Sequence, residues 1–100
     1  MPRAQRPSPA ELATGWPDLA SSDPSAEVAR RFARRLRAAI GERSIRSVAV
    51  LSDVNHATVL AILAGRAWPD LYTISKLERG LQADLWPGRL DPGTPSGTVT

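Results

Sequence analysis

The sequence contains no cysteine, one histidine and one lysine among its 100 residues. The absence of cysteine excludes a disulfide scaffold, a thiolate zinc site and a thiol nucleophile. A single histidine cannot form a polyhistidine metal site, and the sequence shows no acid–base pair, glycine-rich phosphate loop or metal cluster. No apolar run approaches the roughly 18–20 residues that cross a membrane. We therefore expect neither an enzyme nor a membrane protein, with no metal or other cofactor and no small-molecule substrate.

The basic residues are almost all arginine. The chain has 12 arginines, a net charge of +3 and a pI near 10.6. Arginine forms planar hydrogen-bonded forks with phosphates and base edges, so this composition favours an acidic partner. A GC-rich genome, which favours arginine and alanine codons, is the alternative explanation. The N-terminal residues 1–6 are basic but lack an apolar stretch, which argues against a secretory signal and favours a cytoplasmic protein.

Prolines predict the domain boundaries. Five of the nine lie before residue 25 and three lie after residue 86. Residues 1–24 are therefore predicted to be a partly disordered, proline-rich segment, residues 25–87 the folded domain, and residues 88–100 a flexible tail. Within the first segment, Ser8-Pro9-Ala10-Glu11 has the pattern of a capping box, which predicts a short helix near residues 9–14.

Four helices are predicted in the folded domain. The first begins near Asp23-Pro24 and ends at Gly41, with an apolar stripe repeating every four residues: Val28, Phe32, Leu36 and Ile40. The second follows Ser44 and ends near Asp53. The third covers residues 56–64 and ends at Gly65. With no strand predicted, the expected fold is all-α, a compact bundle of four to five helices.

The last predicted helix runs from Asp70 to Leu81, and Gly80 is expected to weaken its end. Its apolar positions are spaced by three, three and four residues: Leu71, Ile74, Leu77 and Leu81. A final short turn is predicted at residues 84–86, before Pro87.

Two further patterns concern tryptophan and the charged face of the first helix. Each of the three tryptophans precedes a proline, at residues 16, 68 and 86, and we expect hydrophobic clamps at helix boundaries. Arg30 and Arg31 are expected to belong to a solvated outer face.

The second and third helices carry the functional signal. Residues 44–53 and 56–64 are separated only by Val54 and Asn55. The small Ala49 allows the helices to cross closely, and Val54 is expected to fill the joint from inside. A short pair of this kind, crossing at roughly 90–120°, is a helix-turn-helix. Its second helix projects an N-terminal end that fits a DNA major groove about 12 Å wide.

Residues 44–86 resemble the lambda-repressor-like, XRE/Cro class of helix-turn-helix DNA-binding domains. The stretch Leu81-x-Ala83-Asp84-Leu85-Trp86-Pro87 is similar to the closing turn of actinobacterial members. The other matching features, in chain order, are Ser44, Val48-Ala49, Val54-Asn55, Thr58-Val59, Ile62, Gly65, Pro69-x-Leu71 and Thr73. The similarity is greatest to phage repressor and Cro-type members.

This resemblance implies a sequence-specific, double-stranded DNA-binding transcriptional regulator. A phage or prophage repressor of this type would confer immunity by binding an operator and occluding a promoter, on the nucleoid in the cytoplasm of a bacterial host. The family frame assigns base contacts to the start of the third helix, namely Asn55, His56, Ala57, Thr58 and Ala61. It assigns phosphate contacts to Arg43, Ser44, Arg46, Ser47 and Arg66, with Arg35 as a further candidate.

The third helix departs from the family in lacking long polar side chains. Alanine contacts a thymine methyl but makes no bidentate hydrogen bond, whereas His56 can donate to a purine N7. Specificity would then depend on few direct contacts, on Arg46, or on DNA shape.

Two other functions stay open. One is the antitoxin of a toxin–antitoxin pair, and the other is a protein-interaction module that keeps the bundle without binding DNA. The sequence also leaves open whether the chain is a monomer or a homodimer.

Overall fold

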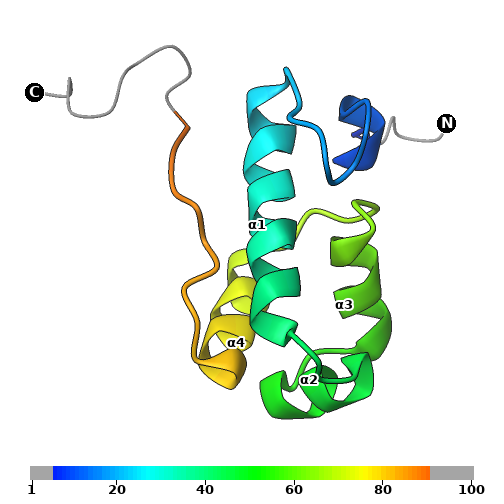
Figure 1. Cartoon of the computed structure of the whole chain (residues 1–100). Coiled ribbons are helices and arrows are strands. Elements are labelled where there is room, and N and C mark those ends of the chain that lie inside the picture. The colour runs from blue at the N-terminus through cyan, green and yellow to red at the C-terminus, as the bar shows by residue number, and fades with distance from the viewer. Residues whose placement is uncertain (1–5, 91–100) are drawn as a thin grey trace, which may run out of the picture.

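The computed structural model describes residues 6–90. A short 3-10 helix, η1, comes first, and four α-helices follow: η1 Ala10–Leu12, α1 Pro24–Ile40, α2 Ile45–Ser52, α3 His56–Leu63 and α4 Leu71–Leu81. Within these residues there is no strand, so the predicted all-α fold is confirmed. In Figure 1, the long α1 stands between α3 and α4, and α2 lies across one end of the bundle.

Each α-helix begins where a polar side chain caps its first turn. The first amides of a helix have no partner within the helix, and a side-chain oxygen just before them satisfies one of them. Here the four capping side chains accept from backbone N–H groups two or three residues later, and they are Asp23, Ser44, Asn55 and Asp70. These local signals explain why the predicted starts of the helices agree with the structure.

The core lies where α1, α2, α3 and α4 meet. Its members include Phe32 and Leu36 of α1, Val48 of α2, Val59 of α3 and Leu77 of α4. All five are almost fully buried.

Leu71 was predicted to continue the apolar stripe of α4, and this is wrong, because the side chain is 80% exposed. At 100° per residue, Leu71 lies about 60° around the helix from Ile74 and about 120° from Leu77. The stripe therefore enters the core only at Ile74.

Gly80 lies one residue before the end of α4 and allows α2 to pack closely against this helix. A Cβ atom at Gly80 would lie 2.6 Å from the Cα of Ser52 and 2.8 Å from the carbonyl oxygen of Leu51. Distances below 3.0 Å are essentially never seen for a real Cβ. The glycine is therefore required by the close contact between two helices.

The predicted turn at residues 84–86 is also wrong, since residues 84–90 have no helical structure. Gln82 ends α4 in the left-handed conformation, with φ of 52°. The backbone amides of Leu85 and Trp86 then donate to Oε2 of Glu78, over 2.8 and 3.0 Å. These two bonds tie the segment after α4 to Glu78.

Residues 6–23, here called the leader, fold back onto the bundle. The capping box forms, with Ser8 N donating to Glu11 Oε1 over 2.7 Å. The indole of Trp68 donates to the carbonyl of Pro7 over 2.9 Å, and Pro9 is fully buried. Trp86, by contrast, is 52% exposed and follows an extended segment. The parts of the predictions that concern residues 1–5 and 91–100 lie outside the described residues.

Arg30 was expected to belong to a solvated face, and this is wrong, because its side chain is only 12% exposed. It makes two hydrogen bonds of 2.8 and 2.7 Å to the carboxylate of Glu27, and Arg31 adds a third of 2.9 Å. The same carboxylate accepts from Ser21 N over 2.8 Å, while Arg30 donates to the carbonyl of Pro17 over 3.0 Å. The pair of Glu27 and Arg30 therefore ties the leader to α1.

The hydrogen bonds from Arg30, together with those from Ser21 and Arg31, lower the pKa of Glu27 to about 2. The carboxylate is therefore ionised at any pH near neutrality, and it in turn raises the pKa of Arg30.

No single helix within residues 6–90 has both the length and the apolar character to span a membrane. Within these residues, α2 and α3 have that length and apolar character only when they are taken together, and a bend of 116° separates them.

Candidate functional site

The candidate site is built on the joint between α2 and α3. Only Asp53, Val54 and Asn55 separate the two helices, which are bent by 116° relative to each other. Asp53 takes the left-handed conformation, with φ of 55°, and this reverses the chain. The Val54 side chain is 9% exposed and belongs to the core, as predicted, and its amide donates to Ala49 O over 3.1 Å. The angle between the helices is thus fixed by packing and by a backbone hydrogen bond.

The joint is braced from α4. Lys76 Nζ lies 3.3 Å from Oδ2 of Asp53 and 4.4 Å from the centre of the Tyr72 ring. The contact with Tyr72, followed by the ion pair with Asp53, raises the pKa of Lys76. Together with the contact at Gly80, this holds the end of α2 against α4.

The first turn of α3 is open to solvent. Asn55, His56 and Ala57 are exposed, while Thr58 and Ala61 are half-buried. The side chain of Asn55 is partly engaged, because its Oδ1 accepts from Ala57 N over 2.7 Å. The structure thus places four of the five residues predicted to contact bases at the first turn of α3, and Ala61 lies on the next turn.

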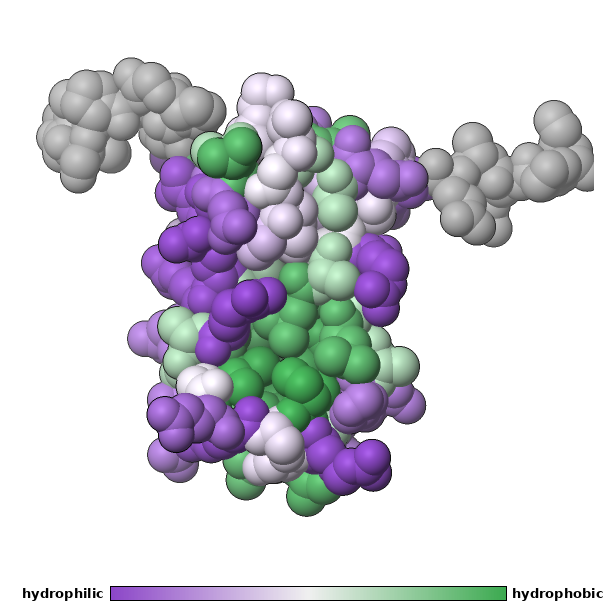
Figure 2. Space-filling view, turned by 45° about the vertical axis from the view of Figure 1, so that its right-hand side comes forward, coloured by the Kyte–Doolittle hydropathy of each residue, from purple (hydrophilic) through white to green (hydrophobic). Residues whose placement is uncertain are grey.

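The exposed face of α3 is apolar. Val59 and Ile62 point into the core, so the opposite side of the helix centres on Ala57. At 100° per residue, three further apolar side chains lie within about 60° of Ala57 on that side, and they are Leu60, Ala61 and Ala64. Leu60 is 39% exposed. Figure 2, in which the side carrying α3 comes forward, shows a hydrophobic area with hydrophilic residues on both flanks.

Four of the five residues predicted to contact phosphates lie just before and at the start of α2. Arg43, Ser44 and Arg46 are exposed, and Ser47 is half-buried. The Ser44 hydroxyl accepts from Ser47 N over 3.0 Å, and Arg43 donates to Ala39 O over 3.1 Å. These residues form one polar cluster at the end of the molecule that α2 occupies (Figure 1).

Arg66, the fifth, lies apart from this cluster. It is exposed and follows α3, so it stands one helix length, about 12 Å for eight residues, from His56. The further candidate, Arg35, donates to the carbonyl of Trp86 over 3.2 Å, so it also holds the segment after α4.

The trailing end of α3 is closed by the leader, which the sequence did not predict. Trp16 Nε1 donates to Leu63 O over 2.9 Å, and Ala10 N donates to Gly65 O over 2.9 Å. Gly65 has φ of +74°, and a Cβ there would lie 2.6 Å from Cε2 of Trp16. The capping box and the Trp16-Pro17 pair were the visible signals, but neither one identifies its partner.

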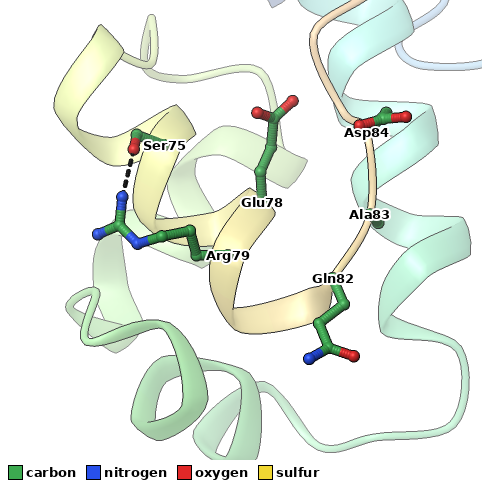
Figure 3. Close-up of a pocket in the computed structure, with 6 residues that line it drawn as sticks. All are labelled: Ser75, Glu78, Arg79, Gln82, Ala83 and Asp84. Atoms are coloured by element: carbon green, nitrogen blue, oxygen red, sulfur yellow. Dashed lines mark hydrogen bonds between the residues drawn. The ribbon is translucent and has the colours of Figure 1, made fainter.

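A hollow of about 340 Å³ lies at the end of α4 (Figure 3). Two of its three charged side chains already have partners, since Glu78 accepts from two backbone amides and Arg79 donates to Ser75, and the third is Asp84. No group of three histidine, aspartate or glutamate side chains suited to a metal ion occurs in the part of the chain that the structure describes.

Comparisons with protein-family models, with curated proteins and with solved structures find no match to this chain.

Proposed function

We propose that this chain is a sequence-specific, double-stranded DNA-binding transcriptional regulator in which α2 and α3 form a helix-turn-helix. The observation that supports this most strongly is the 116° joint, which leaves the first turn of α3 exposed. A helix presented in this way fits the major groove, where base edges are accessible. The resemblance of residues 44–86 to lambda-repressor-like domains agrees with this function.

The polar cluster at the start of α2 would hold the DNA backbone. Free amides and the helix dipole make the start of a helix favourable for a phosphate, and Arg43 and Arg46 add full positive charges beside it. Arg66 would contact the backbone beyond the other end of α3. These contacts fix the register of the protein on the duplex, and α3 then reads the bases.

The regulatory mechanism in this proposal is occupancy of a promoter. The bound domain excludes RNA polymerase, with no catalytic step and no cofactor. By its resemblance to phage repressor and Cro-type members, the protein acts as a phage or prophage repressor.

The test is fluorescence anisotropy with duplexes from the promoter regions that flank the gene, compared with scrambled duplexes of equal composition. We expect a preference for one native duplex and an affinity that falls steeply with salt. Arg46→Ala should reduce the slope of log K against log salt by about 0.9. Arg34→Ala is the matched control, because Arg34 is also exposed but lies beside Pro17 and Asp18 of the leader. Equal affinity for all duplexes, or equal effects of the two substitutions, would contradict the proposal.

A protein-interaction module is the second candidate, and the apolar exposed face of α3 is the observation that favours it. Leu60, at 39% exposure, is the largest apolar side chain of α3 that reaches solvent. In this case the folded domain would bind no duplex, and Arg46→Ala and His56→Ala would leave its function intact.

A further inference from the structure

The exposed face of α3 has almost no hydrogen-bonding capacity. Ala57, Leu60, Ala61 and Ala64 carry no polar side-chain atom. Among the polar side chains at the first turn, Asn55 uses its carbonyl oxygen as a helix cap. His56 and Thr58 lie on the two borders of the face, about 100° to either side of Ala57, and Thr58 is half-buried. Few hydrogen bonds to base edges are therefore available.

Such a face discriminates between bases through their apolar groups. In the major groove every base presents hydrogen-bond donors or acceptors, and thymine alone also presents a methyl group, at C5. A donor or acceptor placed against alanine loses its water without gaining a partner, which is unfavourable. A methyl group placed there leaves water for an apolar surface, which is favourable. Both effects favour thymine.

The sizes of the side chains agree with this mode of contact. Ala57 and Ala61 are short, so the backbone of α3 can approach the floor of the groove closely enough for methyl contact. Leu60 extends from one flank of the face and can cover a second methyl group. His56 supplies one polar contact, to a purine N7.

We propose that α3 recognises thymine C5-methyl groups, so that the preferred site has thymines at the positions that face Ala57, Leu60 and Ala61. This inference rests on the proposed DNA-binding function and names the class of base that the site selects. It also assigns specificity to side chains that would otherwise be regarded as mere spacers.

The test begins with selection of binding sites from a random duplex library, using the full chain. In the selected duplex, thymines within the footprint are then replaced one at a time by uracil, which lacks only the C5-methyl group. We expect the selected core to be rich in thymine, and each facing replacement to reduce affinity about fourfold. Uracil outside the footprint is the control and should have no effect.

A variant provides an independent measurement. Ala57→Gln introduces an amide that pairs with adenine N6 and N7, and glutamine is well tolerated in an exposed helix. Repeating the selection with this variant should shift one position of the site from thymine towards adenine. An unchanged circular dichroism spectrum and melting temperature would verify that the variant is folded.

The outcomes separate this inference from the function on which it rests. Selective binding that uracil replacement leaves unchanged would overturn methyl recognition while leaving the DNA-binding function in place. A library from which no duplex is enriched would overturn both.

Discussion

The two ends of α3 differ in what surrounds them. At its leading end, Asn55 caps the helix and the side chains of His56 and Ala57 are exposed. At its trailing end, the leader covers the chain, with Trp16 bonded to Leu63 O and Ala10 bonded to Gly65 O. Figure 1 shows η1 above the trailing end and α2 below the leading end.

This difference shows how a helix of only eight residues can be held firmly and yet present a free end. An isolated helix of that length is unstable in water, and the last carbonyls of a helix lack partners within it. Here the chain that follows α3 donates to the carbonyls of Leu60, Ala61 and Ile62, and Trp16 of the leader donates to that of Leu63. The leading end is therefore available to a ligand without having to support the helix.

Replacement of Gly80 by alanine should have the largest effect, because it disturbs the packing of α2, which leads into α3, against α4. The new Cβ would meet the backbone of Ser52 and Leu51, so α2 must move away from α4. We expect a loss of about 3 kcal/mol in the free energy of unfolding, measured by urea denaturation. In an uncrowded helix the same substitution would stabilise by up to about 1 kcal/mol, so a gain would contradict the proposed contact.

Gly65→Ala should disrupt the contact between the leader and the trailing end of α3, and leave the leading end undisturbed. The residue has a positive φ, and its Cβ would strike Trp16 and Ala10. We expect a loss of about 2–3 kcal/mol and a shifted indole N–H signal of Trp16 in NMR spectra. Gly88→Ala is the matched control, because Gly88 has φ of +84° but no atom within 4 Å of a Cβ. It should cost about 1–2 kcal/mol, and equal losses at the two sites would contradict the close contact with the leader.

Acid should next reduce the stabilisation that the ionised Glu27 carboxylate gives to the folded protein. Since the pKa of Glu27 is lowered from 4.5 to about 2, the stabilisation is complete above pH 4.5 and declines as the pH falls towards 2. Linkage gives a loss of about 2 kcal/mol by pH 3, which urea denaturation at several pH values would measure. Glu27→Gln should be less stable at pH 7 and should lack this contribution, and an unchanged acid dependence would exclude Glu27 as its source.

The smallest expected effect concerns the leading end. Asn55→Ala removes the cap and should reduce stability by about 1 kcal/mol. Asn55→Asp keeps a cap of similar quality but places a negative charge where DNA is proposed to bind. It should therefore leave the melting temperature nearly unchanged while weakening duplex binding, as measured by anisotropy. If Asn55→Asp and the natural chain bind the duplex with equal affinity, the DNA does not bind at the leading end of α3.

The sequence was sufficient for features with local causes. The starts of the helices could be predicted because each cap, such as Ser44 or Asn55, lies within three residues of the amide that it satisfies. The burial of Val54 in the joint could also be predicted from local sequence, because the two predicted helices on either side of it define the position of the joint. The exposure of His56 and Ala57 at the start of α3 follows from the same pattern.

Features with distant partners could not be predicted. Trp16 bonds to a residue 47 positions away, and Trp68 to one 61 positions away. Gly80 has the same local signature whether it weakens a helix or allows one to pack closely. Arg30 could not be distinguished from a solvated arginine, because its burial depends on how the leader passes over α1.

The most direct test of the central claim is an NMR titration of the full chain with a duplex that it binds selectively. If the leading end of α3 meets the DNA, the amide signals of residues 44–47 and 55–61 should shift progressively. Those of Ala10 and Trp16 in the leader, and of Leu85 beside Glu78, should remain unchanged. Shifts confined to the leader or to the end of α4, with none at His56 and Ala57, would contradict the claim.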